Sequence, residues 1–358
     1  MTRWLVLGAT GTVGRQLAST LATRPDASVV AVSRNRVLLD ELCNRLGCET
    51  VELDVASPSA TVERLPKADV VVDLTYSGGR HPRSVVRKAE RAAALIGAYL
   101  DTHEGARLVH TGTWVLIQRR PHDSERLVSE LDWTSTYTLS KSAAERALAR
   151  GWRHGRMRVV RLGNVVTPDS MWGAALLRAL RAGQVDSEAA LASPANACGV
   201  NAVMNTIDDP DGAPVSLASS GAGWSWGELL AAAASAVSDR GGFVCGGWGA
   251  AGPAPSDSRE RGLSPQSLVL RALWPLPLRL DSLPLDAVPG WARAAPALKR
   301  ALGSLEAPPI FRLPPGLPAE PPMPGAGRDL GELEAMASGL ADAYMNRGYF
   351  PWSRNGAE

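Results

Sequence analysis

Near its N-terminus the chain reads Trp4-Leu5-Val6-Leu7-Gly8-Ala9-Thr10-Gly11-Thr12-Val13-Gly14. The first four residues form a short apolar run that is typical of a buried strand, and Val13, Leu17 and Leu21 then recur at helical spacing. A glycine-rich turn between a strand and a helix lets the backbone approach a pyrophosphate closely, and the helix N-terminus favours negative charge. The stretch therefore predicts a dinucleotide-binding site that contains Gly8, Thr10, Gly11, Thr12, Val13 and Gly14.

This stretch is the first unit of a longer alternation. Apolar runs of the buried-strand type recur at 29–32, 50–53, 70–72, 107–110 and 157–161, and helical patterns stand between them at 37–46, 83–99 and 136–150. Alternating strands and helices predict an α/β fold of the Rossmann type, a doubly wound parallel sheet with helices on both faces. Such sheets bind ligands at the carboxyl ends of their strands.

The alternation stops near residue 168. We expect an NADP-binding domain with the catalytic residues at 1–168 and a smaller substrate-binding lobe at 169–358. The segment at about 196–220 is expected to return to the first domain. Within the lobe the pattern predicts a helix at 170–183, a strand at 213–218 and a helix from 225 to 237. The proline-rich stretch 308–327 is most simply a surface connection.

The end of the second strand indicates which cofactor is bound. An acidic residue at this place would hold the ribose hydroxyls of NAD(H), but the chain has Ser33-Arg34-Asn35-Arg36. A hydroxyl and a guanidinium suit a 2′-phosphate, so NADP(H) is favoured over NAD(H). The alternative is a solvated Arg34 that points away from the site. Further cofactor contacts are expected from residues after the third and fourth strands, namely Asp54, Val55, Leu74, Thr75 and Tyr76.

The segment Thr136-Tyr137-Thr138-Leu139-Ser140-Lys141 carries the predicted chemistry. Residues four apart lie on one face of a helix, so Lys141 can reach toward the phenol of Tyr137. A nearby ammonium favours the phenolate and brings the hydroxyl closer to the range in which it exchanges protons at neutral pH. The bare Y-x-x-x-K pattern is more often a solvated helix face. Downstream of a complete glycine turn it predicts a nicotinamide enzyme with Tyr137 as acid/base and Lys141 as a cofactor contact.

With these motifs in place the chain resembles the extended short-chain dehydrogenase/reductase family, the NAD(P)-dependent epimerase/dehydratase group. The resemblance covers about residues 3–168. It rests on the glycine turn, on Asp54-Val55, on Tyr137 to Lys141 followed by Ser142-Ala143-Ala144-Glu145, and on Arg161-Leu162-Gly163-Asn164-Val165-Val166-Thr167-Pro168. The last segment is similar to one that lies under the nicotinamide in the family, which implies cofactor contacts from Gly163, Asn164 and Val165.

The resemblance implies a third catalytic residue, a Ser or Thr just after the fifth strand. Thr113 is the choice and Thr111 the reserve in His110-Thr111-Gly112-Thr113-Trp114-Val115. A threonine hydroxyl can hydrogen-bond the reacting oxygen of a substrate. The alternative is that both threonines only end the strand. Sugar dehydratases of the family place Asp-Glu directly after the threonine, and Trp114-Val115 stands here instead, so a dehydratase is disfavoured.

The expected function is that of an NADP(H)-dependent oxidoreductase. It would transfer hydride between the nicotinamide and a secondary alcohol or ketone of a small, largely apolar metabolite, as a ketoreductase in biosynthesis would. The Trp, Leu and Pro content of 268–285 suggests an apolar cover for such a substrate. One alternative is a redox-neutral epimerase, for example of a sugar nucleotide, with a tightly bound cofactor. Another is a non-catalytic NADP(H)-binding sensor.

Composition excludes several other classes. A net charge of +2 gives no reason to expect nucleic acid as a partner, and no apolar stretch is long enough for a spanning helix. The N-terminus has no signal-peptide pattern, so a cytoplasmic protein is expected. The four cysteines and five histidines show no metal-ligand spacing, and no metal site is predicted. A small molecule is the expected substrate, and a homodimer is compatible with the family resemblance.

Overall fold

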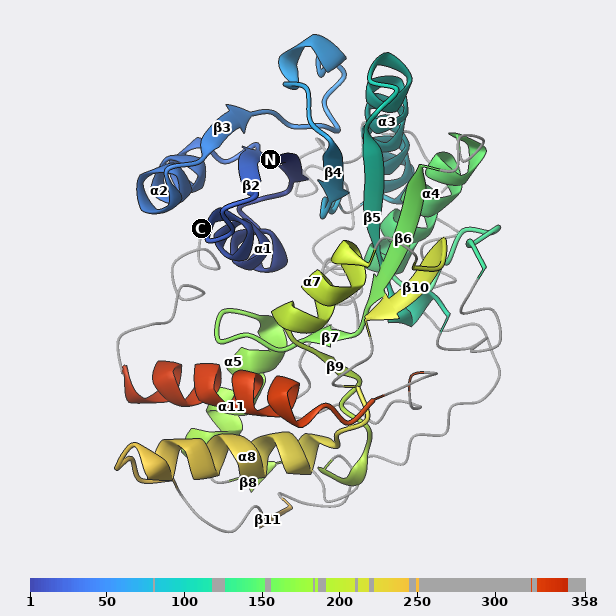
Figure 1. The fold of residues 1–358 in the computed structure, drawn as a ribbon. Coiled ribbons are helices and arrows are strands. Elements are labelled where there is room, and N and C mark those ends of the chain that lie inside the picture. The colour runs from blue at the N-terminus through green and yellow to red at the C-terminus, as the bar shows by residue number, and fades with distance from the viewer. Residues whose placement is uncertain are drawn as a thin grey trace, which may run out of the picture. The chain divides into compact units, whose positions relative to one another are not determined.

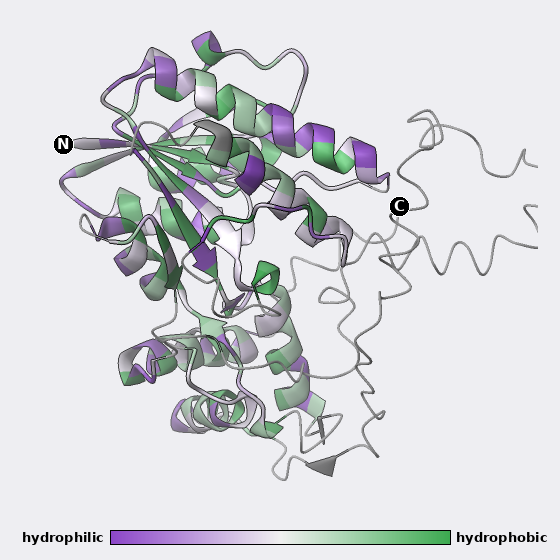
Figure 2. Ribbon diagram, turned by 90° about the vertical axis from the view of Figure 1, so that its right-hand side faces the viewer, coloured by the Kyte–Doolittle hydropathy of each residue, from purple (hydrophilic) through white to green (hydrophobic). Residues whose placement is uncertain are grey.

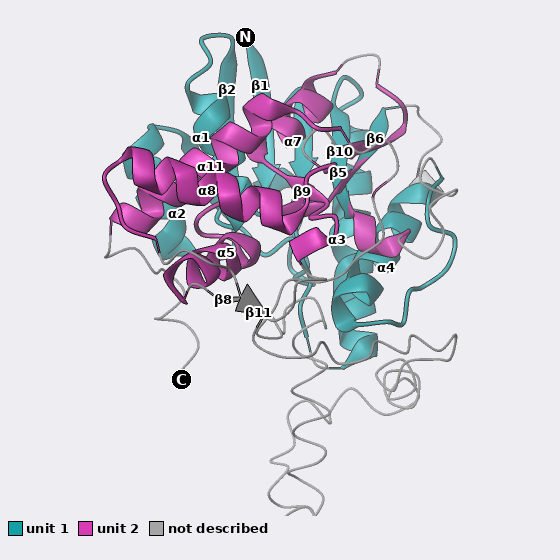
Figure 3. Ribbon diagram, turned by 90° about the horizontal axis from the view of Figure 1, so that it is seen from below, with its two compact units in different colours: residues 1–112, 126–159, 259–312 teal, residues 113–125, 160–258, 313–358 magenta. Residues whose placement is uncertain are grey.

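The computed structural model describes residues 1–79, 81–117, 126–151, 156–182, 184–185, 191–209, 212–218, 222–244, 249–250, 323 and 327–346. These residues fall into two compact units (Figure 3). The first unit holds the described residues of 1–112 and 126–159, and the second holds those of 113–117, 160–250 and 323–346.

The first unit alternates strands and helices along the chain (Figure 1). Its elements are β1 (Thr2–Leu7), α1 (Thr12–Ala22), β2 (Ala27–Ser33), α2 (Arg36–Leu46), β3 (Glu49–Glu52), the 3₁₀ turn Val62–Arg64, β4 (Val70–Asp73), α3 (Pro82–Thr102), β5 (Arg107–Thr113), α4 (Thr136–Gly151) and β6 (Met157–Leu162). β5 and β6 continue for a few residues beyond the bounds of this unit.

The strands form a seven-stranded sheet in the order β10-β6-β5-β4-β1-β2-β3, where β10 is Val215–Ala218. The pairs β1 with β2, β1 with β4, β2 with β3 and β4 with β5 all run parallel. The order reverses direction at β1, from which β2 and β3 lie on one side and β4 and β5 on the other. The Rossmann-type doubly wound sheet predicted from the sequence is confirmed.

The strands are apolar because both faces of the sheet are covered. Alternate residues of β1 join one buried cluster with β2, β4 and α3, which includes Leu5, Leu7, Val30, Val32, Val71, Ile96 and Tyr99. The residues between them, Trp4 and Val6, are buried as well. Full burial of a Leu, Val or Ile side chain stabilises the fold by roughly 1.5–3 kcal/mol relative to leaving it exposed to water. The helices instead mix hydrophobic and hydrophilic residues along their length, as expected when one face meets the core (Figure 2).

The glycine turn between β1 and α1 is sterically tight. Gly8 has φ +82°, in the left-handed region that favours glycine, and its carbonyl accepts a hydrogen bond of 3.0 Å from the N–H of Gly11. A Cβ atom added to Gly14 would lie 2.3 Å from the Gly8 carbonyl oxygen. The first turn of α1 can therefore close on the end of β1 only without a side chain at position 14.

The second unit is mostly helical. Its helices are α5 (Met171–Ala182), α7 (Val200–Asp208), α8 (Trp226–Asp239) and α11 (Leu330–Met345), and its short strands are β7 (Asn164–Val165), β8 (Gln184–Val185), β9 (Ala197–Cys198) and β11 (Gly249–Ala250). β7 pairs with β9, and β8 pairs with β11, both in parallel. Ser225 and Glu228 form a capping box that begins α8.

Two helices of the second unit were not predicted from the sequence. α11 packs against α8, and its buried side chains Leu333, Met336, Ala337, Leu340 and Ala341 recur at helical spacing. Asp329 caps its first turn by accepting from the N–H of Glu332. That signal was present but lies directly after the proline-rich stretch. α7 spans only nine residues, which is too short for a clear periodic pattern.

None of the helices in the described part of the chain has the length and apolarity that crossing a membrane requires. The apolar segment 268–285 and most of the proline-rich stretch 308–327 lie outside the described residues, and the expectations for them stay untested.

Replacing Gly14 by Ala tests the tight turn. We expect Gly14→Ala to lower the free energy of unfolding by about 1–3 kcal/mol, the usual cost of overpacking, because the new methyl group must displace the Gly8 carbonyl. Gly97 is the matched control, since it lies within α3 and its Cβ would meet nothing within 4 Å. Gly97→Ala should raise the free energy of unfolding by roughly 0.5–1 kcal/mol. Equal stabilities of the two variants in urea titrations would contradict the close approach.

Candidate active site

A cleft in the first unit opens where β1, β2, β3 and β4 end. It is lined by Gly8, Thr10, Gly11, Val32, Ser33, Arg34, Leu53, Asp54, Val55, Ala56, Leu74, Thr75, Tyr76, Ser77 and Lys88. The candidate residues from the glycine turn and from the ends of these strands therefore share one cavity. Thr12, Val13 and Gly14 do not line it; they form the first turn of α1, directly after the lining residue Gly11.

Ser33 is the last residue of β2 and lines the cleft. Its hydroxyl is 2.6 Å from the hydroxyl of Thr10 in the glycine turn, and it accepts from the N–H of Asn35 at 3.3 Å. Asn35 in turn caps α2 by accepting from the N–H of Leu38. These contacts connect the glycine turn to the start of α2.

Two arginines follow Ser33 and differ in their partners. Arg36 is an exposed residue that pairs with Asp40 at 2.9 Å, one turn along α2, and lies 3.9 Å from Glu52. Hydrogen bonding to Asp40 raises the pKa of Arg36. Arg34 lines the cleft and, among the described residues, makes no hydrogen bond or ion pair. The structure thus leaves Arg34 available to a ligand, and Arg36 engaged.

One cation in the cleft was not found from the sequence. Lys88 lies on α3, and its Nζ donates to the carbonyl of Gly78 at 3.5 Å. Lys88 lies about two turns after the start of α3, and no sequence motif includes it. Asp54 lines the cleft after β3. One of its carboxylate oxygens accepts from the N–H of Ala56 at 3.1 Å, and this bond begins the turn that follows the strand.

The predicted acid/base pair lies on α4. Ser135 precedes the helix, and its hydroxyl accepts from the N–H of Thr138, which is the usual N-cap bond. Tyr137 is half-buried, and its ring centroid lies 5.4 Å from that of Tyr76 with the planes at 56°. Tyr76 lines the cleft, so the phenol-bearing face of α4 meets the cleft at this ring contact.

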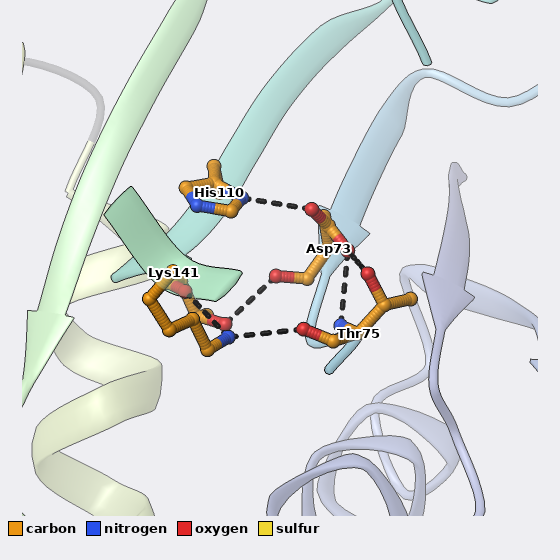
Figure 4. A network of polar contacts seen from close by, with 5 residues as sticks. Asp73, Thr75, His110 and Lys141 are labelled. Carbon is orange, nitrogen blue, oxygen red and sulfur yellow. Dashed lines mark hydrogen bonds and ion pairs between the residues drawn. The ribbon is translucent and has the colours of Figure 1, made fainter. Parts of the chain in front are cut away.

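Lys141 is buried, and its ammonium is held by backbone oxygens (Figure 4). Nζ donates to the carbonyl of Thr75 at 3.0 Å and to the carbonyl of Thr111 at 3.1 Å. Burial lowers the pKa of Lys141, while the negative charges of Asp73 and Glu145 act in the opposite direction. The helix pattern predicted the face on which Lys141 lies, and the two carbonyl partners come from the ends of β4 and β5.

A buried Asp-His pair lies beside these carbonyls. Asp73, the last residue of β4, accepts from Nδ1 of His110 on β5 at 2.8 Å. Burial by itself raises the pKa of Asp73, but the bond from His110 and the charges of His110 and Lys141 outweigh it and lower the pKa to about 2. The sequence analysis gave neither residue a role. An acidic residue that ends the otherwise apolar run 70–72 was the available signal.

The two candidate threonines differ in what their hydroxyls do. The hydroxyl of Thr111 donates to the backbone carbonyl of Asp73 at 2.7 Å, so it is committed inside the protein. Thr113 is the last residue of β5 and is buried. β5 extends through both residues, three positions further than the predicted strand 107–110. Thr113 belongs to the second unit, and its catalytic role stays a prediction.

The candidates Gly163, Asn164 and Val165 also belong to the second unit, where β7 pairs with β9. The side-chain amide of Asn164 donates to the carbonyl of Ala195 at 2.7 Å. A Cβ atom on Gly163 would lie 2.2 Å from the carbonyl oxygen of Asn196. These residues therefore have a packing role within their unit, and their predicted contact with a nicotinamide stays a prediction.

The fold and the cleft can be compared with known proteins. The model of a family described as NAD(P)H-binding matches residues 8–159. The UDP-Glc/GlcNAc 4-epimerase of Campylobacter jejuni has 13% identity and a TM-score of 0.52, with 77% of this chain and 98% of that chain covered. TunA, an NAD-dependent NDP-hexosamine 5,6-dehydratase of tunicamycin biosynthesis, has 15% identity and a TM-score of 0.50, with 80% and 100% covered. No curated protein matches the sequence.

At such identities the solved structures establish the fold, and the family match establishes what the first domain binds. The resemblance drawn from the sequence motifs is confirmed at the level of the fold: residues 8–159 match the model of an NAD(P)H-binding family, and the chain shares its fold with a solved 4-epimerase and a solved NAD-dependent dehydratase.

Proposed function

We propose that the protein is an NADP(H)-dependent oxidoreductase that interconverts a secondary alcohol and a ketone on a small, largely apolar metabolite. One observation carries this proposal. Lys141 is fixed by the backbone at the ends of β4 and β5, and Tyr137 on the same helix contacts a ring that lines the cleft. A tyrosine that can act as the acid, a lysine that can assist it and a cleft that fits a dinucleotide thus occur within one unit, and together they suit hydride transfer to a carbonyl.

In this proposal Tyr137 gives its proton to the substrate oxygen during reduction and takes it back during oxidation. The Lys141 ammonium favours the phenolate form, so less energy is needed to move the proton at neutral pH. The bound cofactor supplies or accepts the hydride, and the protein contributes orientation and electrostatics. Thr113 would hydrogen-bond the same oxygen, a role favoured over Thr111 because the Thr111 hydroxyl is already committed to Asp73.

The preference for NADP(H) rests on the end of β2. Arg34 lines the cleft without a partner among the described residues, and a guanidinium binds a phosphate through several donors. Lys88 is a second cation of the same cleft. No acidic residue occupies the segment 33–36, where an NAD-selective site would need one.

A panel of ketones with NADPH tests the reaction, followed by loss of NADPH absorbance. Stoichiometric NADPH consumption supports the proposal. A redox-neutral epimerase would change the substrate without net consumption, and a sensor would bind NADPH and turn over nothing. The redox proposal fails if wild-type protein binds NADPH but oxidises none of it across the panel while epimerising a substrate.

The first prediction concerns cofactor choice. Arg34→Ala should weaken NADPH binding roughly ten- to a hundredfold, because a hydrogen bond to a charged group contributes about 1.5–3 kcal/mol. NADH binding should hardly change. Arg36→Ala is the matched control, since Arg36 is engaged with Asp40, and it should leave both affinities within a few-fold. Calorimetric titration measures the four affinities, and a wild type that prefers NADH refutes the assignment.

The second prediction concerns the acid/base. Tyr137→Phe should lower turnover by about 10²–10⁴, the usual loss for a general acid or base, while NADPH affinity stays near that of the wild type. Tyr76→Phe is the control, because Tyr76 offers a neighbouring phenol in ring contact. It should keep turnover within a few-fold. Full activity of Tyr137→Phe, or equal losses in both variants, would remove Tyr137 from the mechanism.

The third prediction concerns Lys141. Lys141→Met keeps most of the aliphatic chain but loses the charge, so it should weaken NADPH binding, lower turnover and shift the pH–rate profile to alkaline pH. The shift follows because the phenol of Tyr137 loses its neighbouring cation. Lys88→Met should weaken NADPH binding without moving the profile, since Lys88 lies on α3 and contacts Gly78. An unshifted profile in Lys141→Met would argue that the lysine only holds the cofactor.

A further inference from the structure

The buried charge of Lys141 requires an explanation within the first unit. Asp73, His110 and Lys141 are exposed by only 2%, 1% and 6%. Removing a charge from water costs several kcal/mol unless a partner and hydrogen bonds compensate for it. The motifs of the family resemblance include Lys141 but neither Asp73 nor His110. Both residues are buried near Lys141, and their contacts indicate what compensates for the buried ammonium.

The carboxylate of Asp73 first organises the turn after β4. Its Oδ1 accepts from the N–H of Thr75 at 2.9 Å and from the hydroxyl of Thr75 at 2.6 Å. Its Oδ2 accepts from Nδ1 of His110. The backbone carbonyl of Asp73 accepts from the hydroxyl of Thr111. One residue thus anchors Thr75 through its side chain and Thr111 through its main chain (Figure 4).

The same two threonines provide the carbonyl groups that hold Lys141. Nζ donates to the carbonyl of Thr75 and to that of Thr111, and these account for two of its three N–H groups. Within the described residues the third N–H has no partner. The ammonium is therefore positioned by residues that Asp73 fixes, and one donor stays free for a ligand or for Tyr137.

The charges around Lys141 also favour its ammonium form, in addition to the hydrogen bonds that hold it. The elements around Lys141 carry Asp73 at the end of β4, Arg107 and His110 on β5, and Tyr137, Glu145 and Arg146 on α4, where Tyr137 and Glu145 lie one turn from Lys141. Asp73 and Glu145 both raise the pKa of Lys141 against the effect of burial. Glu145 accepts from the N–H of Val128 and contacts neither of the two threonine carbonyls in the described hydrogen bonds. The pKa of about 2 for Asp73 means that its negative charge is present throughout the working range of pH.

We propose that Asp73, supported by His110, is a positioning residue of the active site: its hydrogen bonds fix the two carbonyl groups that hold Lys141, and its charge keeps that amine protonated. The inference deepens the proposed function, in which the charged amine assists Tyr137 and contacts the cofactor. His110 acts on Asp73 and not on the substrate, since its Nδ1 bond orients the carboxylate and stabilises its ionised form.

The lysine content of the chain makes a direct test practical. The sequence has four lysines, Lys67, Lys88, Lys141 and Lys299, so a protein labelled with ¹³C at lysine Cε gives four signals, and Lys141→Arg identifies one of them. Titration of that signal with pH measures the pKa of the Lys141 amine. The protein is used without cofactor, so the result does not depend on whether NADPH binds.

We expect Asp73→Asn to lower the pKa of the Lys141 amine by about one unit or more, a tenfold loss of proton affinity, because an opposite charge at close range is removed. Glu145→Gln should lower it by less. Tyr99→Phe is the control for a lost buried hydrogen bond, since Tyr99 donates to Pro66 and accepts from Ala68 in the core of the same unit. It should leave the pKa of Lys141 unchanged.

If Asp73→Asn does not fold, the double variant Asp73→Leu with His110→Phe replaces both partners by apolar groups, which is often tolerated where a single loss is not. It should lower the pKa of Lys141 in the same way. An unchanged pKa in whichever variant folds overturns the inference, as does a larger shift in Glu145→Gln or an equal one in Tyr99→Phe. Failure of wild-type protein to bind NADPH would instead refute the proposed function and leave the titration interpretable.

Discussion

The burial of the Lys141 ammonium is the constraint on which the candidate site depends. A buried cation needs oxygen atoms of the protein in place of water. Here two backbone carbonyl oxygens near the ends of adjacent strands lie 3.0 and 3.1 Å from Nζ of Lys141. Thr75 and Thr111, which provide these carbonyls, are both hydrogen-bonded to Asp73. A compact, strongly hydrated ammonium suits this arrangement better than the wide fork of an arginine would.

The parallel sheet explains why residues that are far apart in the sequence line one cleft. In a parallel sheet every strand ends at the same edge, so the residues after β1, β2, β3 and β4 converge although they are far apart in sequence. The same edge carries the glycine turn, where α1 can begin because position 14 has no side chain to meet the Gly8 carbonyl. Tyr76 connects the two regions, since it lines the cleft and contacts the ring of Tyr137. Cofactor binding and proton transfer would thus share one rigid edge.

Local patterns predicted the first unit well because its elements are long and buried. The apolar runs of β1, β2 and β4 and the helical spacing in α1 and α3 have one structural solution each, and the sheet confirmed it. The second unit was less predictable, since strands of two residues such as β7 and β9 have no detectable period. The cleft residues were predictable because ligands bind where the strands of a parallel sheet end, and the residues after the first four apolar runs could be read from the sequence. Lys88 was not, because its place depends on how α3 lies against the loop after β4.

The buried network shows what sequence patterns leave out. The sequence places His110 at the end of a predicted strand, where packing is the simplest explanation, and indicates no partner for it. Its pairing with Asp73 depends on the register of β4 against β5, in which these two residues stand opposite each other. The two arginines after β2 illustrate the same limitation, because the pairing of Arg36 with Asp40 and the place of Arg34 in the cleft lining are properties of the structure. Which of two like charges serves a ligand is decided by the partners each already has, and those partners are set by tertiary structure.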